Sequence, residues 1–358
     1  SLVMTGRRPS ATARLIAPAC ALRADDDPLD LRFAAEWALV SQDLDATCTF
    51  SRPSAVSEDT LIEIYEHNDG WRTLRFVDVD PMLRKHVQWT QSAVRFAEDG
   101  FTREGRAIAL EYQKSMCAVA LATTASSGTD LPQRMLVLGL GGGTLPQLLC
   151  SHLSEAEVEL TAVELDPVVA EAAAELGLSE RVQVHVGDAQ AWLRSHVAAG
   201  RPRYDAIFVD ISDTDNLQPP VFYSAEFLTD VKAALTNRGL VLSNMHRGDG
   251  GGDGSGGALE RSLQAASAEY AAAFPGPSAC CLVPTLPCGF QTAAEKAGLL
   301  AVEAAADEER LTHVILAASA DPSAFARPEA LRRAALEQRA TRGLLFDVAA
   351  RLDGLVVS

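Results

Sequence analysis

The sequence predicts an α/β protein with a Rossmann-like, doubly wound sheet that is preceded by a small antiparallel β-unit. Three observations support this fold class. A short apolar run from Met135 to Leu138, typical of a buried parallel strand, leads directly into a glycine loop. After the loop, strand-like and helix-like segments alternate, as they do in βαβ units. Before it, from Leu61 to Phe96, short apolar runs are separated by turn residues, which indicates antiparallel strands.

The small β-unit is expected to contain three strands joined by turns. They are predicted over Leu61–Tyr65, Trp71–Val77 and Ser92–Phe96. Apolar residues at helical spacing then predict a helix over Arg106–Leu121. A linker rich in Ser, Thr and Gly, residues 122–132, connects this helix to the strand that precedes the glycine loop.

The main domain is expected to have a seven-stranded sheet whose last two strands form a hairpin with an enlarged connection. The strands are predicted over Met135–Leu138, Val158–Val163, Val182–Val186, Tyr204–Val209, Leu240–Ser243, Cys280–Val283 and His313–Ala317. A turn is expected at Asn237–Gly239. Helices are predicted over Leu145–Leu153, Asp166–Leu176, Ala189–Ala199, Phe222–Leu235, Ala258–Phe274 and Pro328–Leu352.

We expect the chain to divide into a tail over residues 1–30, the β-rich unit over 31–100 and the main domain over 101–358. The glycine-rich segment Gly248–Gly257 is predicted to be a flexible surface insertion. The first 24 residues contain four arginines and no acidic residue, which fits either an organelle transit peptide or a disordered tail. The expected location is therefore the cytoplasm or, if the tail is a transit peptide, a plastid or mitochondrion.

Composition narrows the functional classes. Acidic residues outnumber basic ones by 48 to 31, and the net charge of -17 disfavours nonspecific binding to nucleic acid or to an anionic membrane. The same charge suits a cationic acceptor. No apolar run reaches the roughly 18 residues that a membrane span needs, so a soluble protein is expected. The seven cysteines form no CxxC pair and the histidines lack metal-binding spacing, so no metal is predicted. Only His246 is expected near the site.

The glycine loop itself indicates the kind of ligand. It contains Gly139, Gly141 and Gly143 and ends at Thr144, where the dinucleotide fingerprint G-x-G-x-x-G requires another glycine. Glycines let the backbone turn sharply and approach a ligand, and the following helix offers free N–H groups. No second half-site for a dinucleotide follows. The loop therefore favours an adenosyl-sulfonium ligand.

Acidic residues follow the strands that come after the loop, at the sheet edge where open α/β folds bind ligands. Glu164 is expected to bind both ribose hydroxyls, and Asp188 to accept from the adenine amino group beside the Ala189 backbone. Asp210 is expected to face the reacting end of the ligand. Each acid alone also fits a solvated strand end or a helix cap. Together with the glycine loop they predict a nucleoside site.

The stretch from Trp71 to Met245 resembles the spermidine synthase-like branch of the class I S-adenosylmethionine-dependent fold. Within that branch it is similar to the carboxyl-terminal domain of the methyltransferase-like protein 13 group, which modifies elongation factor 1A. The matching motifs are Gln91-Ser92, Glu111-Tyr-Gln-Lys-Ser-Met116, Leu138-Gly-Leu-Gly-Gly-Gly-Thr-Leu-Pro146, Val163-Glu-Leu-Asp-Pro167, Val186-Gly-Asp188 and Tyr204-Asp-Ala-Ile-Phe-Val-Asp210.

The resemblance implies S-adenosylmethionine as a methyl-donating co-substrate and a homodimer as the expected assembly. It also implies that Gln91 and Tyr112 close the pocket over the methionine tail and that Leu165 belongs to the donor site. Polyamine synthases of this branch have Asp at the position of Thr144. Because an Asp would repel the carboxylate of intact S-adenosylmethionine and a Thr hydroxyl can bind it, the sequence favours methyl transfer.

Three functions stay open. The first is methyl transfer to an amine by in-line displacement at a carbon bonded to a sulfonium. The acceptor is either a protein, through a Lys side chain or an amino terminus, or a small amine. Asp210 is the first candidate for the group that holds the ammonium and accepts its proton, and Asp213 is the second. Asp213 equally fits a turn residue. The second function is aminopropyl transfer to a polyamine, which the spacing of Asp210 and Asp213 also fits. The third is a non-catalytic homologue that binds the nucleoside and serves as a scaffold.

Overall fold

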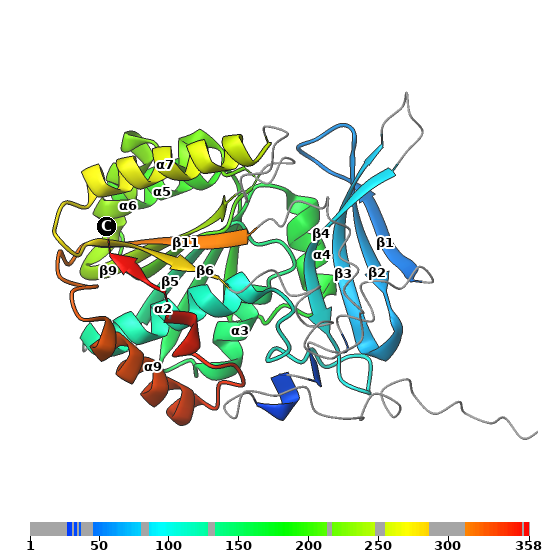
Figure 1. Ribbon diagram of the computed structural model, residues 1–358. Coiled ribbons are helices and arrows are strands. Elements are labelled where there is room, and N and C mark those ends of the chain that lie inside the picture. The colour runs from blue at the N-terminus through cyan, green and yellow to red at the C-terminus, as the bar shows by residue number, and fades with distance from the viewer. Residues whose placement is uncertain are drawn as a thin grey trace, which may run out of the picture.

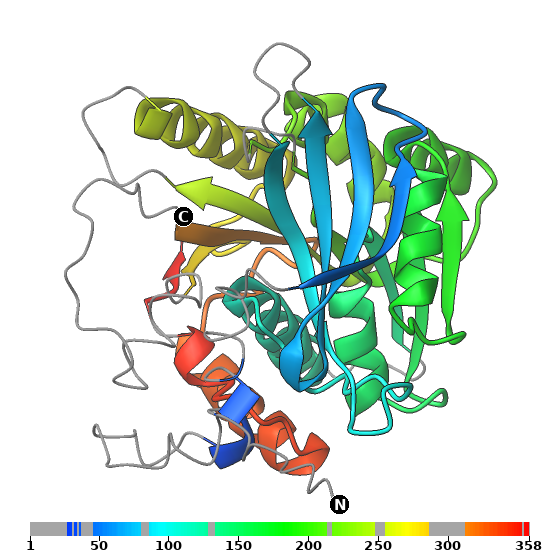
Figure 2. The same cartoon turned by 90° about the vertical axis from the view of Figure 1, so that its right-hand side faces the viewer.

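The computed structural model describes residues 27–30, 32–33, 36, 46–79, 86–127, 133–212, 217–247, 255–285, 312–352 and 354–357. The described part of the chain contains two sheets together with the helices that pack against them (Figure 1). The smaller sheet lies at one end of the molecule and faces the viewer in Figure 2. The basic segment 1–26, predicted to be a tail or transit peptide, lies outside the described residues.

The small sheet is antiparallel, as predicted, but it has four strands in the order β1-β2-β3-β4. These are β1 (Thr47–Pro53), β2 (Thr60–Glu66), β3 (Trp71–Val79) and β4 (His86–Arg95), with the 3-10 turn η2 (Asn68–Gly70) between β2 and β3. Strand β1 was missed because its side chains are mostly exposed, so it lacks an alternation of apolar and polar residues. The predicted third strand, Ser92–Phe96, covers only the end of β4.

The large sheet has the strand order β12-β10-β11-β9-β8-β5-β6-β7. Strands β5 to β9 are parallel to one another, and β11 runs antiparallel to β9. The seven predicted strands and the closing hairpin are present, and the short β12 adds an eighth by pairing with β10. Their bounds are β5 (Gln133–Leu138), β6 (Val158–Glu164), β7 (Val182–Val186), β8 (Tyr204–Val209), β9 (Leu235–Arg247), β10 (Cys280–Pro284), β11 (Thr312–Ser319) and β12 (Val356–Val357).

Helices cover both faces of the large sheet (Figure 1). Strand β5 shows why, because Met135 and Val137 belong to one apolar cluster while Leu136 and Leu138 belong to the other. One face packs against α2 (Glu111–Ser127), α3 (Thr144–His152) and α9 (Pro328–Arg342). The opposite face packs against α5 (Ala189–Ala198), α6 (Ala225–Ala234) and α7 (Ser255–Ala273).

Helix α4 (Pro167–Glu175) joins the two sheets. Its Val169 and Ala172 share a buried apolar cluster with Ile62 and Leu74 of the small sheet. In addition, the Oγ of Ser54, just after β1, donates to the carboxylate of Asp166, the N-cap residue of α4, at 2.6 Å. The small sheet is therefore fixed against the carboxyl-end side of β6.

Several predicted helix bounds are wrong. Helix α2 begins at Glu111 instead of Arg106, because the preceding Ala107 and Ala109 are buried beside Trp71 in an irregular segment. The predicted helix Phe222–Leu235 divides into the 3-10 turn η3 (Pro220–Tyr223) and α6, which Ser224 caps. The predicted helix Pro328–Leu352 ends at Arg342, because Gly343 takes a left-handed φ of 62° there. A separate 3-10 turn, η4 (Ala350–Leu352), follows.

Two predicted loops are also corrected. The turn signal Asn237–Gly239 lies inside β9, where the pairing of Tyr204 with Leu235 is followed by that of Ala206 with Leu240. Strand β8 thus advances by two residues while β9 advances by five, so the turn residues form a bulge. In the predicted flexible segment Gly248–Gly257, the last three residues belong to the first turn of α7, and 248–254 lie outside the described residues.

Candidate active site

The glycine loop lies at the carboxyl ends of the parallel strands, between β5 and α3. Gly139, Gly141 and Gly143 have φ angles of 89°, 51° and 67°, which favour glycine. A Cβ atom on Gly139 would lie 2.3 Å from the carbonyl oxygen of Asp210, so the ends of β5 and β8 approach closely only because this residue is glycine. Gly143 is the N-cap residue of α3 and has no side chain with which to cap it.

The small sheet contributes directly to the loop. The Oγ of Ser92 in β4 accepts from the backbone N–H of Gly142 at 2.9 Å. Gln91 precedes it at a β-bulge, because Leu74 pairs with Ser92 and the next residue of β3 pairs with Thr90. Bulges redirect side chains and are frequent beside active sites. Gln91 is therefore the sequence neighbour of a residue that contacts the loop, and its place over the methionine tail stays a prediction. Ser92 is a loop contact that the sequence analysis did not assign.

Glu164, at the end of β6, contacts the loop through its carboxylate. It accepts from the backbone N–H groups of Leu140 at 2.9 Å, Gly141 at 3.4 Å and Asp166 at 3.0 Å. Burial raises the pKa of Glu164, although these hydrogen bonds act in the opposite direction. A carboxylate has about four lone-pair sites, so these bonds leave capacity for a further donor. The ribose contact stays a prediction.

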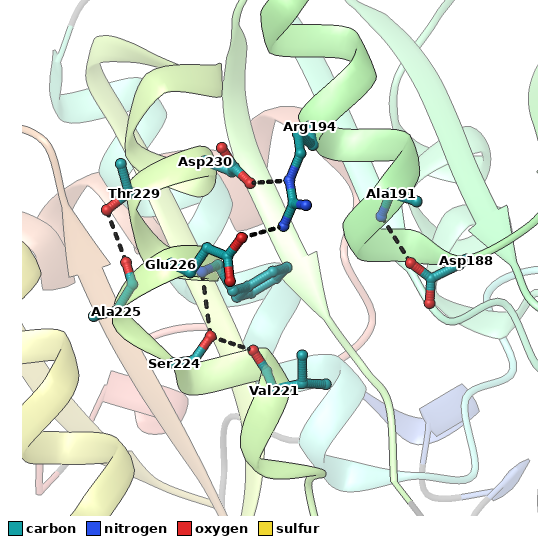
Figure 3. A network of polar contacts seen from close by, with 10 residues as sticks. Asp188, Ala191, Arg194, Val221, Ser224, Ala225, Glu226, Thr229 and Asp230 are labelled. Carbon is teal, nitrogen blue, oxygen red and sulfur yellow. Dashed lines mark hydrogen bonds and ion pairs between the residues drawn. The ribbon is translucent and has the colours of Figure 1, made fainter.

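Asp188 and its neighbours lie at the ends of β6 and β7, on the same side of the candidate site as Glu164. The Asp188 carboxylate accepts from the backbone N–H of Ala191 at 2.7 Å and so caps α5 (Figure 3). Ala189 follows it as the first residue of the helix. Two apolar side chains at neighbouring strand ends are unusually exposed, Leu165 at 52% and Val186 at 54%. Such a pair suits a flat aromatic ring. Leu165 was predicted here, whereas Val186 was not.

Asp210 follows β8 and is held by side chains. It accepts from the Tyr112 hydroxyl of α2 at 3.0 Å and from the Asn244 Nδ2 of β9 at 3.0 Å. Each donor contacts a different carboxylate oxygen. Burial raises the pKa of Asp210 to about 6, and the two hydrogen bonds only partly oppose this effect. The structure therefore brings together Tyr112 and Asp210, which the sequence analysis named. It also places Asn244, which the sequence analysis did not name, as a second donor to Asp210.

A second layer lies behind these donors. The Nδ1 atom of His313, in β11, lies 2.9 Å from the Oδ1 atom of Asn244. The His313 ring stacks on the Tyr112 ring with centroids 4.5 Å apart, and the His246 ring lies 4.2 Å away. Burial, together with His246, lowers the pKa of His313 to about 3. His246 was the only histidine expected here. His313 could be found only from the register in which β9 and β11 pair.

Other predictions have simpler outcomes. Asp213 lies outside the described residues. Within the described part of the chain, no three His, Cys, Asp or Glu side chains gather closely enough to bind a metal ion. A search of the same residues finds no helix with the length and apolar character that crossing a membrane requires.

Known proteins resemble only part of this chain. No protein-family model matches it. It is 28% identical over 225 residues to the mouse protein named eEF1A lysine and N-terminal methyltransferase, an alignment that covers 54% of this chain and 32% of that protein. It is also 32% identical over 116 residues to a polyamine aminopropyltransferase of Vibrio vulnificus, covering 32% of this chain and 38% of that protein. The chain thus spans about a third of the length of these relatives.

A solved structure shows the same fold. The chain aligns with a probable spermidine synthase from Corynebacterium glutamicum with a TM-score of 0.55 at 18% identity, covering 82% of this chain and 87% of that one. This likeness confirms the predicted fold class. Together with the two relatives, it confirms the predicted resemblance to both the methyltransferase and the polyamine-synthase groups.

Proposed function

We propose that this protein is an S-adenosylmethionine-dependent methyltransferase whose acceptor is an amine of a protein, either a Lys side chain or an amino terminus. One observation carries the proposal. A partly buried carboxylate with a raised pKa, Asp210, adjoins a glycine loop that ends in Thr144 where an aminopropyltransferase would have an acid. The similarity to the mouse methyltransferase of eEF1A supports the choice of a protein amine.

The donor half of the site supports binding of an adenosyl group. Glu164 would bind the ribose and Asp188 the adenine amino group, with Leu165 and Val186 on either side of the ring. The methionine carboxylate would face the uncapped start of α3, where Thr144 is the first residue. Free N–H groups at a helix start favour an anion. The bound donor supplies a methyl group on a sulfonium, which is already a good leaving group.

The acceptor half supports proton removal from an amine. The amine nitrogen attacks the methyl carbon in line, the N–C bond forms as the C–S bond breaks, and the amine proton passes to Asp210. A pKa of about 6 leaves Asp210 ionised at neutral pH but still basic enough to accept a proton. Tyr112 and Asn244 orient the two carboxylate oxygens. Asp213 is the second candidate base, and Gln91 would cover the methionine tail.

The experiment compares donors and acceptors with the full chain. Calorimetry with S-adenosylmethionine and with its decarboxylated form is expected to show tighter binding of the intact molecule. Incubation with methyl-labelled S-adenosylmethionine and purified eEF1A, or a cell extract, is expected to label protein. Tighter binding of the decarboxylated form would contradict the proposal, and binding of S-adenosylmethionine without labelling of any acceptor would favour the nucleoside-binding scaffold.

Aminopropyl transfer is the second candidate, supported by the similarity to the Vibrio vulnificus enzyme and by the contact between Tyr112 and Asp210. Here the acceptor amine would attack the aminopropyl carbon, the N–C bond would form as the C–S bond breaks and the thioether nucleoside leaves, and Asp210 would again take the proton. Chromatography of polyamines after incubation with putrescine and decarboxylated S-adenosylmethionine tests it. Spermidine would be formed only if this second candidate is correct.

A further inference from the structure

One side chain, His313, contacts both groups that donate to Asp210. Its Nδ1 atom lies 2.9 Å from Asn244, and its ring stacks on Tyr112 with an angle of 19° between the ring planes. The two donors come from β9 and α2, which are far apart in the chain, whereas His313 reaches both from β11. His313 does not touch Asp210 in any recorded hydrogen bond of the described residues, so an effect on the carboxylate would act through the two donors.

The hydrogen bonds specify the protonation state of the His313 ring. An ionised carboxylate can only accept, so the Asn244 amide must present its NH₂ group to Asp210. Its Oδ1 atom then faces His313 and is also an acceptor. His313 Nδ1 must therefore carry a proton. A neutral ring with its proton on Nδ1 satisfies this requirement, and burial favours the neutral form.

Removing the Nδ1 donor of His313 would change the hydrogen bonding of the Asp210 carboxylate. Without a donor behind it, the Asn244 oxygen loses the hydrogen bond that fixes the plane of the amide, so its NH₂ group is held less firmly on the carboxylate. One of the two hydrogen bonds to the carboxylate would be weakened, and its ionised form would be less favoured. Among the residues that the structure describes, the ionisable groups that face this cluster are Tyr112 from α2 and His246 from β9, in addition to Asp210 and His313 themselves.

We propose that His313, as a neutral ring protonated on Nδ1, is a positioning residue that orients Asn244 and Tyr112 around the Asp210 base. The inference rests on the proposed function, because it assigns Asp210 the task of accepting the amine proton. His313 comes from β11, which supplies no residue to the donor half of the site. With this role for His313, β11 contributes a side chain to the acceptor half.

Two substitutions of His313 separate its contact with Asn244 from its contact with Tyr112. His313→Phe retains a ring that can stack on Tyr112 and removes the donor to Asn244. His313→Asn retains an N–H donor close to the position of Nδ1 and removes the ring. The readout is the pH profile of kcat/KM for methyl transfer, together with a carbon-13 titration of the Asp210 carboxyl in the full chain. Donor affinity, measured with S-adenosylhomocysteine, is the control, because neither substitution touches Glu164 or the glycine loop.

We expect the acid limb of the profile and the Asp210 titration to move up by about one pH unit in His313→Phe. Its kcat/KM falls about twofold at pH 7 and about tenfold at pH 5, whereas His313→Asn keeps the wild-type midpoint within a few tenths of a unit. Donor affinity changes less than about twofold in both. If His313→Phe does not fold, His313→Gln replaces it, because its amide reaches the Nε2 position instead of Nδ1.

An unchanged Asp210 titration in the variant that lacks the Nδ1 donor would overturn the inference. So would equal shifts in His313→Phe and His313→Asn, since the donor would then be irrelevant. The titration requires no turnover, which separates this failure from that of the proposed function. A wild-type protein that transfers no methyl group but whose Asp210 titration depends on the His313 donor would refute the proposed function and leave the positioning role intact.

Discussion

The two halves of the site hold their carboxylates in different ways. In the donor half, Asp188 accepts from a backbone N–H three residues away, and Glu164 accepts from backbone N–H groups of the adjacent glycine loop and of Asp166. In the acceptor half, Asp210 accepts from the side chains of Tyr112 and Asn244, which are 98 and 34 residues away. Backbone donors are supplied by nearly any sequence of the right shape, whereas side-chain donors require particular residues.

This difference separates the residues expected to bind the donor from those expected to act in the methyl-transfer step. The donor half depends on strand ends, a glycine loop and helix starts, which belong to the fold that this chain shares with the Corynebacterium glutamicum protein. The acceptor half depends on side chains from α2 and β9 that donate to Asp210, and burial of the carboxylate raises its pKa to about 6 against these hydrogen bonds. We therefore expect substitutions in the acceptor half to change turnover, and substitutions in the donor half to change affinity for the donor.

The largest expected effect comes from Asp210→Asn. The substituted amide can accept from Asn244 with its oxygen and donate to the Tyr112 hydroxyl with its nitrogen, so the geometry is retained while the base is lost. We expect kcat for methyl transfer to fall by roughly 10²- to 10⁴-fold, the usual contribution of a general base. Calorimetry with S-adenosylhomocysteine should give an unchanged Kd. Turnover close to that of the wild type would remove Asp210 from the mechanism.

The same substitution is expected to stabilise the protein at neutral pH. Folding raises the pKa of Asp210 from 3.8 to about 6, so the folded state binds more protons than the unfolded state between these pH values. The free energy of unfolding therefore falls as pH rises through this window and levels off above it. The loss is at most about 3 kcal/mol, and Asp210→Asn avoids it.

Denaturant unfolding of wild type and Asp210→Asn at pH 4 and pH 7 measures this difference. The lowered pKa of His313 has the opposite sign, because the folded state then binds fewer protons than the unfolded state below pH 6.5. Comparing the two proteins at each pH removes this shared contribution. An Asp210→Asn variant that is no more stable than wild type at pH 7 would show that burial costs the carboxylate little.

A smaller effect is expected from Glu164→Gln in the donor half. Both Glu164 oxygens accept from backbone N–H groups, so the amide would turn one acceptor into a donor that faces another donor. We expect Kd for S-adenosylhomocysteine to rise roughly 10- to 100-fold, equivalent to about 1.5–3 kcal/mol, while kcat at saturating donor changes little. Glu159→Gln on the same strand, where Glu159 is half-exposed in a surface ion pair with Arg134, is the control. Equal Kd values for both variants would exclude Glu164 from the donor site.

The donor half could be predicted from the sequence because its signals are local. The apolar run before Gly139 and the acids that end β6, β7 and β8 are each visible within a few residues. Parallel strands then bring those ends to one edge of the sheet, so no knowledge of side-chain packing was needed. The exposed Val186 was missed, because an apolar residue at the end of a buried strand gives no sign of its exposure.

The acceptor half could be predicted only in part. Asp210 ends a strand and was found, but its partners Asn244 and His313 depend on how β9 pairs with β11. In the chain, 64 residues (248–311) separate the end of β9 at Arg247 from the start of β11 at Thr312, and nothing in the sequence gives the register across them. The same physical limit explains the misplaced start of α2, because the burial of Ala107 and Ala109 is set by the distant Trp71 and not by the local pattern.

The smallest expected effect tests whether Asp188 binds the donor or only caps a helix. Asp188 caps α5 and Ser224 caps α6 through the same kind of hydrogen bond, to a backbone N–H three residues on (Figure 3). Asp188→Ala and Ser224→Ala should therefore each lower the free energy of unfolding by about 1 kcal/mol. Only Asp188 ends a strand of the donor half, so only its loss should weaken donor binding, by about fivefold. Equal donor affinity in the two variants would mean that Asp188 is a helix cap alone, and that the donor half recognises adenine through its apolar walls and backbone.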